Sequence, residues 1–312
     1  MDDRKRIDEA TGTPTVGHEW DGIEELDTPM PRWWLYTLYA CIAFAAVYIV
    51  LYPAIPFLNS ASAGTLGWSS KGELAAAMNA ESARRGPIRL ALAQMPIEQL
   101  SANPGLLHQA EEGGKSAFKV HCVQCHGSGA AGSKGYPNLN DDDWIWGGDI
   151  VAIKTTLVNG IRQPGNDATR ISQMPAFGRD GILKAAEIDD LVAHVRAISG
   201  QAKPRAAAVR GAVLFTANCA VCHGPDGKGM REFGAPNLAD SIWLNGGSPE
   251  ALTTSISNAR GGVMPSWGGR LDPVTIKMLA AYVHSLGGGE ALPTSVDPTS
   301  APQQQVAALT AY

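Results

Sequence analysis

The chain has 312 residues, of which 45% are hydrophobic, and a formal net charge of -5 at pH 7. That length predicts two compact domains with an anchor or terminal tails rather than one domain. The negative charge and the lack of a Lys/Arg-rich block in the sequence exclude a basic stripe that would follow phosphates, so nucleic acid is not an expected partner.

An apolar run near the N-terminus predicts one membrane-spanning helix. Trp33–Ser70 contains no charged residue, and its first 20 residues reach Tyr52 without a proline. A helix of that length rises about 30 Å, the hydrocarbon thickness of a bilayer, and aromatic residues lie near both ends. We therefore expect a transmembrane helix at residues 33–53. The alternative is a cleaved signal peptide with Ala61–Ala63 at the cleavage site, but the run is longer than a signal-peptide core.

Four of the five cysteines fall into two copies of one motif, Cys122-Val-Gln-Cys125-His126 and Cys219-Ala-Val-Cys222-His223. This spacing allows both thiols to form thioether bonds to the vinyl groups of one haem and puts the histidine under the iron as an axial ligand. A zinc site needs four Cys/His ligands, whereas each motif offers three. A redox dithiol predicts neither the histidine nor the repetition. The sequence thus predicts two covalently bound haem c groups.

Haem attachment also orients the chain, because covalent haem is fitted outside the cytoplasm. We therefore expect residues 1–32 to be a cytoplasmic segment and residues 54–104 to be a periplasmic connecting segment. The composition of residues 1–20 further predicts that most of them are disordered, and the same holds for a tail at residues 291–312.

The cysteine motifs open two copies of a longer repeat. Pro137–Gly148 aligns with Pro236–Gly247 without a gap, with seven of twelve residues identical, and Met174–Gly178 later matches Met264–Gly268. Each repeat closes with a helical pattern of apolar residues: Ile188, Leu191, Val192 and Val195 in the first, and Ile276, Leu279, Ala280 and Val283 in the second.

The repeat predicts two tandem helical haem domains at residues 105–200 and 205–290. Gly200–Pro204 is the expected linker between them, too short to let them separate far. Asp272 and Pro273 are typical of the N-cap and first residue of a helix.

One methionine in each repeat is the expected second axial ligand. Met174 and Met264 occupy equivalent positions, and a thioether is soft enough to hold ferrous iron. His/Met ligation raises the reduction potential and leaves no open position for oxygen or peroxide. Which methionine caps which haem stays open, because exchange between the repeats would use the same two residues.

Two prolines are candidates for supporting the axial histidines. Pro137 and Pro236 follow His126 and His223 by 11 and 13 residues. A carbonyl at such a place either fixes the imidazole through its second nitrogen or simply belongs to a turn. Asp141–Asp143, with Glu111 and Glu112, are either a docking face for a basic donor or a solvated polar face.

With these residues in place, the sequence resembles the di-haem cytochrome c subunit (subunit III) of the bacterial cbb3-type haem-copper oxidases. The most specific stretch is His18–Trp34, which runs directly into the apolar helix. The resemblance implies an all-α fold with one N-terminal transmembrane helix followed by two tandem cytochrome c domains. It assigns the same haem residues, Cys122, Cys125, His126 and Cys219, Cys222, His223, with Met174 and Met264 as axial ligands of the iron.

The resemblance further implies a single-pass protein of the bacterial inner membrane with both haem domains in the periplasm. Such a subunit relays electrons from a donor cytochrome c, by way of a mono-haem cytochrome c subunit, to the catalytic haem-copper subunit in aerobic or microaerobic respiration. Besides these partners it contacts membrane lipid. It has no catalytic residues of its own within the proton-pumping oxidoreductase.

Two other functions are compatible with haem attachment. A free-standing, membrane-anchored di-haem carrier would need the same residues but no oxidase. A di-haem peroxidase-like enzyme would need one haem with an open or displaceable sixth position, and the two equivalent methionines argue against it.

Overall fold

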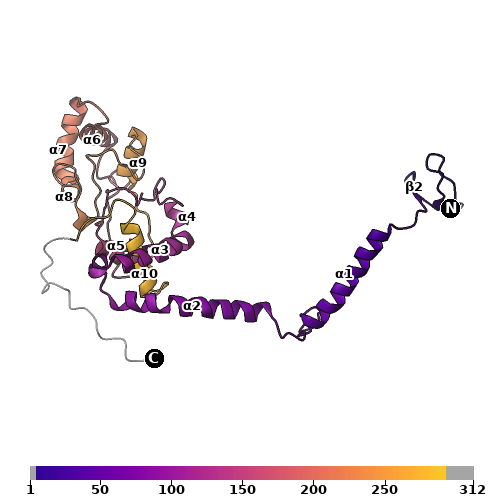
Figure 1. The fold of residues 1–312 in the computed structure, drawn as a ribbon. Coiled ribbons are helices and arrows are strands. Elements are labelled where there is room, and N and C mark those ends of the chain that lie inside the picture. The colour runs from indigo at the N-terminus through magenta and orange to yellow at the C-terminus, as the bar shows by residue number, and fades with distance from the viewer. Residues whose placement is uncertain (1–4, 293–312) are drawn as a thin grey trace. The chain divides into compact units, whose positions relative to one another are not determined.

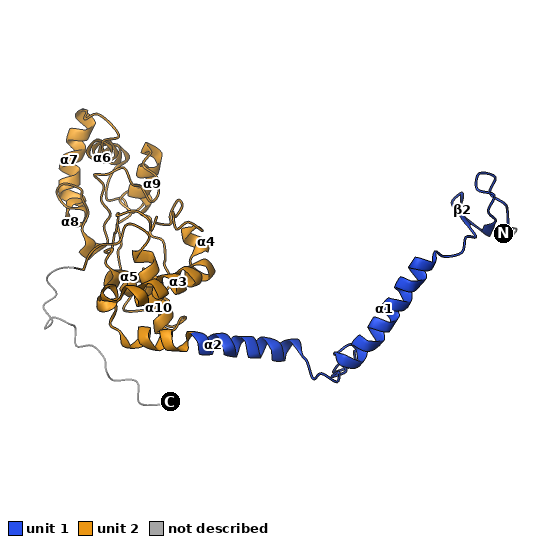
Figure 2. Ribbon diagram, in the orientation of Figure 1, with its two compact units in different colours: residues 1–84 blue, residues 85–312 orange. Residues whose placement is uncertain are grey.

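The computed structural model describes residues 5–292, so the expected tail at residues 291–312 lies outside it except for its first two residues. The chain divides into two compact units, residues 1–84 and 85–312 (Figure 2). The boundary falls inside a long helix, α2 (Ser70–Gln94).

The N-terminal segment contains a β-hairpin of β1 (Thr15–Trp20) and β2 (Ile23–Leu26), which pair antiparallel. Asp21 and Gly22 connect the strands with φ angles of 51° and 85°, as a two-residue hairpin turn requires. The expectation of disorder over most of residues 1–20 is therefore wrong for β1. The Asp-Gly pair is the local signal that the compositional argument overlooks.

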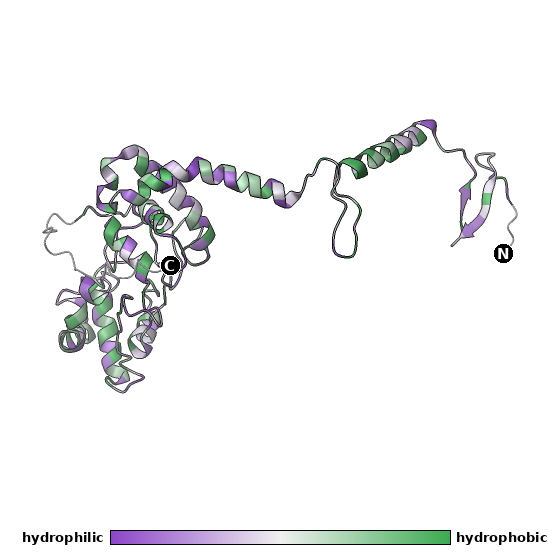
Figure 3. Cartoon of the chain, turned by 90° about the horizontal axis from the view of Figure 1, so that it is seen from below, coloured by the Kyte–Doolittle hydropathy of each residue, from purple (hydrophilic) through white to green (hydrophobic). Residues whose placement is uncertain are grey.

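Helix α1 (Arg32–Leu51) corresponds to the expected membrane segment, and its visible side in Figure 3 is mostly hydrophobic beyond the hydrophilic end at Arg32. By length and composition it can cross a membrane. The chain then folds back on the end of α1: the amides of Thr65 and Leu66 donate to the carbonyls of Val50 and Leu51 at 2.9 and 3.2 Å. These bonds satisfy carbonyls that a helix C-terminus leaves without partners.

Helix α2 has no counterpart in the sequence predictions, which gave residues 54–104 only as a connecting segment. Most of its side chains are exposed, so its sequence lacks the apolar stripe that is typical of a packed helix. Its last turn is held by buried Lys277, whose Nζ donates to the carbonyls of Leu92 and Met95. A cation at the carbonyl end of a helix also interacts favourably with the helix dipole.

The first hydrophobic core, core 1, is built from α3 (Pro104–His121), α5 (Ile150–Asn159) and α10 (Pro273–His284), which lie together in Figure 1, with η1 (Ile97–Ala102) beside them. Helices α3 and α10 approach so closely at Gly114 that a Cβ atom there would collide with the carbonyl oxygen of Met278. One turn later Phe118, 1% exposed, packs its ring on Tyr282 with centroids 5.4 Å apart.

The second core, core 2, repeats this arrangement with α6 (Ala185–Ile198), α7 (Ala206–Asn218) and α9 (Pro249–Asn258) (Figure 1). Here Gly211 meets the carbonyl oxygen of Asp190, and again a Cβ atom would not fit between the two helices. Phe215, 2% exposed, follows one turn later. Both cores therefore use a glycine at the helix crossing and a phenylalanine in the next layer.

Each core combines halves of both repeats. Core 1 takes α3 and α5 from the first repeat and α10 from the second, whereas core 2 takes α6 from the first and α7 and α9 from the second. The closing helices of both repeats form as predicted, with all their eight predicted apolar positions buried. Gly200–Pro204, expected as the linker between the two repeats, joins α6 to α7, and these two helices pack together in core 2.

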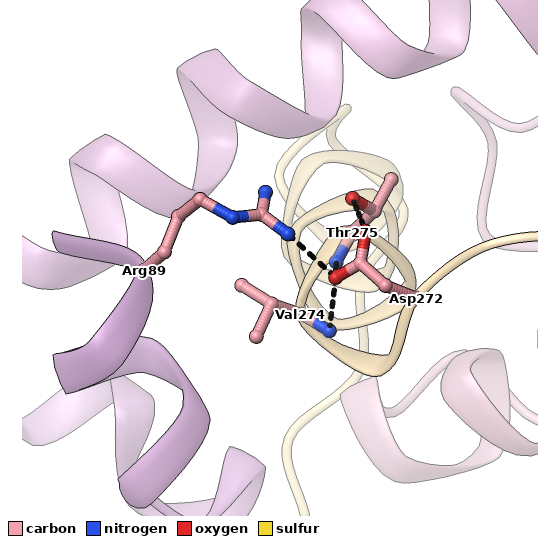
Figure 4. A network of polar contacts seen from close by, with 4 residues as sticks. All are labelled: Arg89, Asp272, Val274 and Thr275. Atoms are coloured by element: carbon pink, nitrogen blue, oxygen red, sulfur yellow. Dashed lines mark hydrogen bonds and ion pairs between the residues drawn. The ribbon is translucent and has the colours of Figure 1, made fainter. Parts of the chain in front are cut away.

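Asp272 starts α10 and also binds α2 (Figure 4). Its side chain accepts from the amides of Val274 and Thr275 at 3.0 and 3.1 Å, and the Arg89 guanidinium lies 2.7 Å from its Oδ1. With Pro273 at the first helical position, this confirms the predicted N-cap.

Replacing Asp272 by alanine should lower the free energy of unfolding by about 1–2 kcal/mol, because two amides lose their acceptor. The matched control, Arg89→Ala, removes only a partly exposed ion pair and should cost about 0.5 kcal/mol or less. Urea unfolding followed by circular dichroism measures both. Equal losses of unfolding free energy in the two variants would mean that the N-cap is not the main contribution of Asp272 to stability.

Candidate functional site

Two short helices carry the cysteine motifs: α4 (Val123–His126) and α8 (Ala220–His223). Each continues directly from a longer helix, since the amide of Cys122 donates to Phe118 at 2.9 Å and that of Cys219 to Phe215 at 2.8 Å. A glycine with φ near 78° ends each one right after the histidine. The packed phenylalanine thus fixes the first cysteine one turn away, in both cores.

Both histidines of the motifs have their second ring nitrogen bound by a proline carbonyl. Nδ1 of His126 lies 3.1 Å from the oxygen of Pro137, and Nδ1 of His223 lies 3.0 Å from that of Pro236. A carbonyl can only accept, so Nδ1 carries the proton and Nε2 keeps a lone pair for a metal ion. Of the two roles that the sequence left open for these prolines, the structure therefore shows the hydrogen bond to the imidazole.

The protonation state of these rings also suits metal binding. Burial lowers the pKa of His126 and of His223, and the hydrogen bond to the proline carbonyl offsets part of that effect. The rings are therefore neutral at physiological pH, which is the form that binds iron.

The buried cysteines do not have the character of reactive thiolates. Burial, with a smaller contribution from the second cysteine of each pair, raises the pKa of the Cys122 and Cys219 thiols to about 11. A redox dithiol needs a lowered thiol pKa. Among residues 5–292 there is also no cluster of three or more His, Cys, Asp or Glu side chains suited to a metal ion. Neither the dithiol nor the zinc alternative gains support.

Met264 lies in core 1, with the cysteine motif of the other repeat. It belongs to the same hydrophobic cluster as Cys122 and Val123. Its amide and carbonyl pair with Ile161, which follows α5, at 3.0 and 2.9 Å. Three residues on, the amide of Trp267 donates to the carbonyl of Leu157 at 2.9 Å.

Met174 lies in core 2 in the equivalent arrangement, with the cysteine motif of the second repeat. It packs in the cluster that contains Cys219 and Ala220. Three residues on, the amide of Phe177 donates to the carbonyl of Ile256 in α9 at 3.1 Å, as Trp267 does in core 1. The structure therefore groups each methionine with the cysteine motif of the other repeat.

Each core thus presents a donor set that fits a c-type haem: two free thiols, a neutral imidazole with Nε2 available, and a thioether. The tryptophans of the repeat, Trp144 and Trp243, pack against core 1 and core 2 respectively. The spacing Gly-x3-Phe-x3-Cys, which begins at Gly114 and Gly211, is the sequence signal that could have predicted how each motif is fixed.

The acidic run Asp141–Asp143 lies at the junction of the two cores and is not uniformly solvated. Asp143 is partly buried in a polar cavity of about 250 Å³ lined by residues of both repeats, Pro236 among them. Burial raises the pKa of Asp143 to about 6, with further contributions from Asp240 and from its two acidic neighbours.

Three family profiles match consecutive parts of the chain. Residues 12–59 match the N-terminal domain of cytochrome oxidase-cbb3, FixP; residues 111–199 match cytochrome c; residues 206–283 match cytochrome c oxidase, cbb3-type, subunit III. The two cytochrome c matches follow the sequence repeats, not the packed cores, and they imply binding of c-type haem.

Several characterised proteins are similar over nearly the whole chain. The cbb3-type cytochrome c oxidase subunit CcoP of Cereibacter sphaeroides is 50% identical over 277 residues, which is 89% of this chain and 96% of that protein. The subunit FixP of a Bradyrhizobium strain is 48% identical over 291 residues, 93% of this chain and 100% of that protein. FixP of Azorhizobium caulinodans is 48% identical over 285 residues, 91% and 96%.

Replacing Asp143 by asparagine should stabilise the protein at neutral pH. Because the folded-state pKa is raised from 3.8 to about 6, the folded protein holds a proton that the unfolded chain releases, so wild-type stability falls as pH rises through that window. We expect Asp143→Asn to gain about 1–2 kcal/mol at pH 7 after allowance for solvent screening, and almost nothing near pH 4. Urea unfolding at both pH values measures this gain in the free energy of unfolding. The exposed control Asp142→Asn should gain less. A gain at Asp143 that did not depend on pH would contradict the raised pKa as its cause.

Proposed function

The chain belongs to the CcoP/FixP family of cbb3-type cytochrome c oxidase subunits, and we propose that it holds two covalent haem c groups whose axial methionines are exchanged between its repeats. As a member of this family it is the electron-transfer subunit of a membrane-bound oxidase. The proposed exchange is one of the two pairings that the sequence left open.

The location of the two methionine loops carries this proposal. In it, Cys122, Cys125 and His126 hold one haem with Met264, and Cys219, Cys222 and His223 hold the other with Met174. The support is the shared hydrophobic cluster in each case and the backbone bonds of each loop to the helix of the other repeat.

The chain's residues determine how such groups behave. Bound in these sites, haem c supplies an iron that accepts and gives up one electron at a time. The Pro137 and Pro236 carbonyls hold the imidazoles in orientation and keep Nε2 free. The thioethers of Met174 and Met264 would serve as the second iron ligands, which would favour the ferrous state and leave no site for peroxide. These roles support electron transfer over the peroxidase-like alternative.

The proposed route begins at a donor cytochrome c and leads through a mono-haem cytochrome c subunit to the catalytic haem-copper subunit. The proposed setting is the bacterial inner membrane, with α1 as a single span and both cores in the periplasm. The support is the apolar length of α1 and the covalent attachment motifs, which are loaded outside the cytoplasm.

The exchange is tested in chains that keep one haem. With Cys219→Ser and Cys222→Ser removing the second attachment, Met264→His should lower the midpoint potential of the remaining haem by an amount on the order of 0.1 V, because imidazole replaces a thioether. Met174→His should leave that potential unchanged. Redox titration followed by visible absorption reads out both.

The reciprocal chain, with Cys122→Ser and Cys125→Ser, should respond only to Met174→His. For the chain that keeps the haem in core 1, Met278→Leu serves as the control. This methionine packs in core 1 but lies in helix α10, not in a methionine loop. If each methionine affected the haem of its own repeat, the exchange would be wrong.

The oxidase setting is tested by purifying the native protein in mild detergent. We expect b-type haem, copper and oxygen consumption to accompany two low-spin c-type haems, because the subunit assembles with the catalytic subunit. Haem spectra, metal analysis and an oxygen electrode measure these. Two c-type haems alone would instead favour a free-standing carrier, and a high-spin haem that binds carbon monoxide would favour an enzyme.

A further inference from the structure

The exchange of methionines requires the chain to cross between the cores twice. It leaves core 1 after Ile161 and reaches Met174 in core 2; it leaves α9 at Asn258 and returns to Met264 in core 1. Both crossing segments are coil, so helix packing does not fix them. Their positions depend on the hydrogen bonds that they make, among them that of the Ser172 hydroxyl to the carbonyl of Gly234.

Arg162 connects the two crossing segments through one guanidinium group. Its Nε donates to the carbonyl of Gly262 at 2.7 Å, and its Nη1 donates to the carbonyl of Ser172 at 3.2 Å. Gly262 comes two residues before Met264, and Ser172 comes two residues before Met174. One side chain therefore holds the carbonyl two residues before each proposed axial ligand.

The backbone of Arg162 is itself fixed at this place. Its amide donates to the carbonyl of Arg170 at 2.9 Å, and the amide of Arg170 donates back to Gly160 at 3.2 Å. Arg162 also has a φ of 52°, in the left-handed region that non-glycine residues rarely adopt. The side chain is partly buried, and its bond to Ser172 is the less exposed of the two.

We propose that Arg162 is a positioning residue that fixes both methionine loops at once and so couples the axial ligation of the two haems. This inference rests on the proposed assignment of Met174 and Met264 as ligands. Arginine suits the task because its planar fork offers several donors in fixed directions, and charge-assisted bonds to carbonyls are stronger than neutral ones. A lysine ammonium, as a point donor, could not keep both directions.

A purely electrostatic role would need only positive charge near Met174. Arg162 lines a cavity of about 430 Å³ that Met174, Arg179 and Arg260 also line. Arg260 therefore provides a control: it is exposed, it lies in the returning segment, and its guanidinium contacts the carbonyl of Asn245 rather than either loop carbonyl.

The test compares Arg162→Asn with Arg260→Gln in the haem-loaded full chain. Asparagine tolerates a positive φ but is too short to reach both carbonyls. Two readouts are used: the charge-transfer absorption of methionine-ligated ferric haem as a function of temperature, and the midpoint potentials of both haems. In Arg162→Asn the temperature of half-loss of methionine ligation should fall by about 5 °C at both haems, with both potentials lowered. Arg260→Gln should leave the ligation temperature unchanged.

The outcomes distinguish the proposed role of Arg162 from the assignment of Met174 and Met264 as ligands. If Met174→His and Met264→His each remove half of the charge-transfer band while Arg162→Asn affects one haem or neither, the coupling role is wrong but the ligands stand. If the methionine variants leave the band intact, the ligand assignment itself fails. An equal effect of Arg260→Gln would mean that charge, not the tether, is responsible. Should Arg162→Asn fail to assemble, Arg162→Lys keeps the charge and must still shift both haems, by a smaller amount.

Discussion

The backbone hydrogen bonds between each methionine loop and the helix end of the other repeat are the constraint on which the rest of the structure depends. Trp267 and Gly268 bind the carbonyls at the end of α5, and Phe177 and Gly178 bind those at the end of α9, with matching donors and acceptors. Once these bonds form, each loop brings its closing helix with it. Helix α10 then packs on α3, and α6 packs on α7, across the close contacts at Gly114 and Gly211.

The two sites differ little because the same local contacts form both. A phenylalanine one turn after the helix crossing fixes the first cysteine, a glycine with positive φ ends the motif helix, and a proline carbonyl sets the histidine tautomer. What distinguishes the sites is their surroundings. Core 1 carries η1 and the end of α2, clamped by Lys277, whereas core 2 has no such addition among the described residues.

The parts of the protein that could be predicted from the sequence are those that local chemistry specifies. The haem motifs, the N-cap at Asp272 and the apolar faces of α6 and α10 follow from spacing and periodicity within a few turns. The exchange between repeats was not predictable, because the loops bind through main-chain atoms and so carry the same residues in either pairing. Helix α2 was missed because its exposed residues show no apolar period, and the hairpin because composition outweighed the Asp21–Gly22 turn.

The exchanged architecture also sets an order of events during synthesis. Core 2 uses only residues from Met174 to Ile256, one unbroken stretch of chain, whereas core 1 joins α3 to α10, about 150 residues apart in sequence. A contiguous core can close while the ribosome is still adding residues, but core 1 must wait for the last helix, and long-range closure is slow. Until then the apolar face of α3 stays uncovered. The core that is continuous in sequence therefore matures first, and the one assembled from both flanks closes after it.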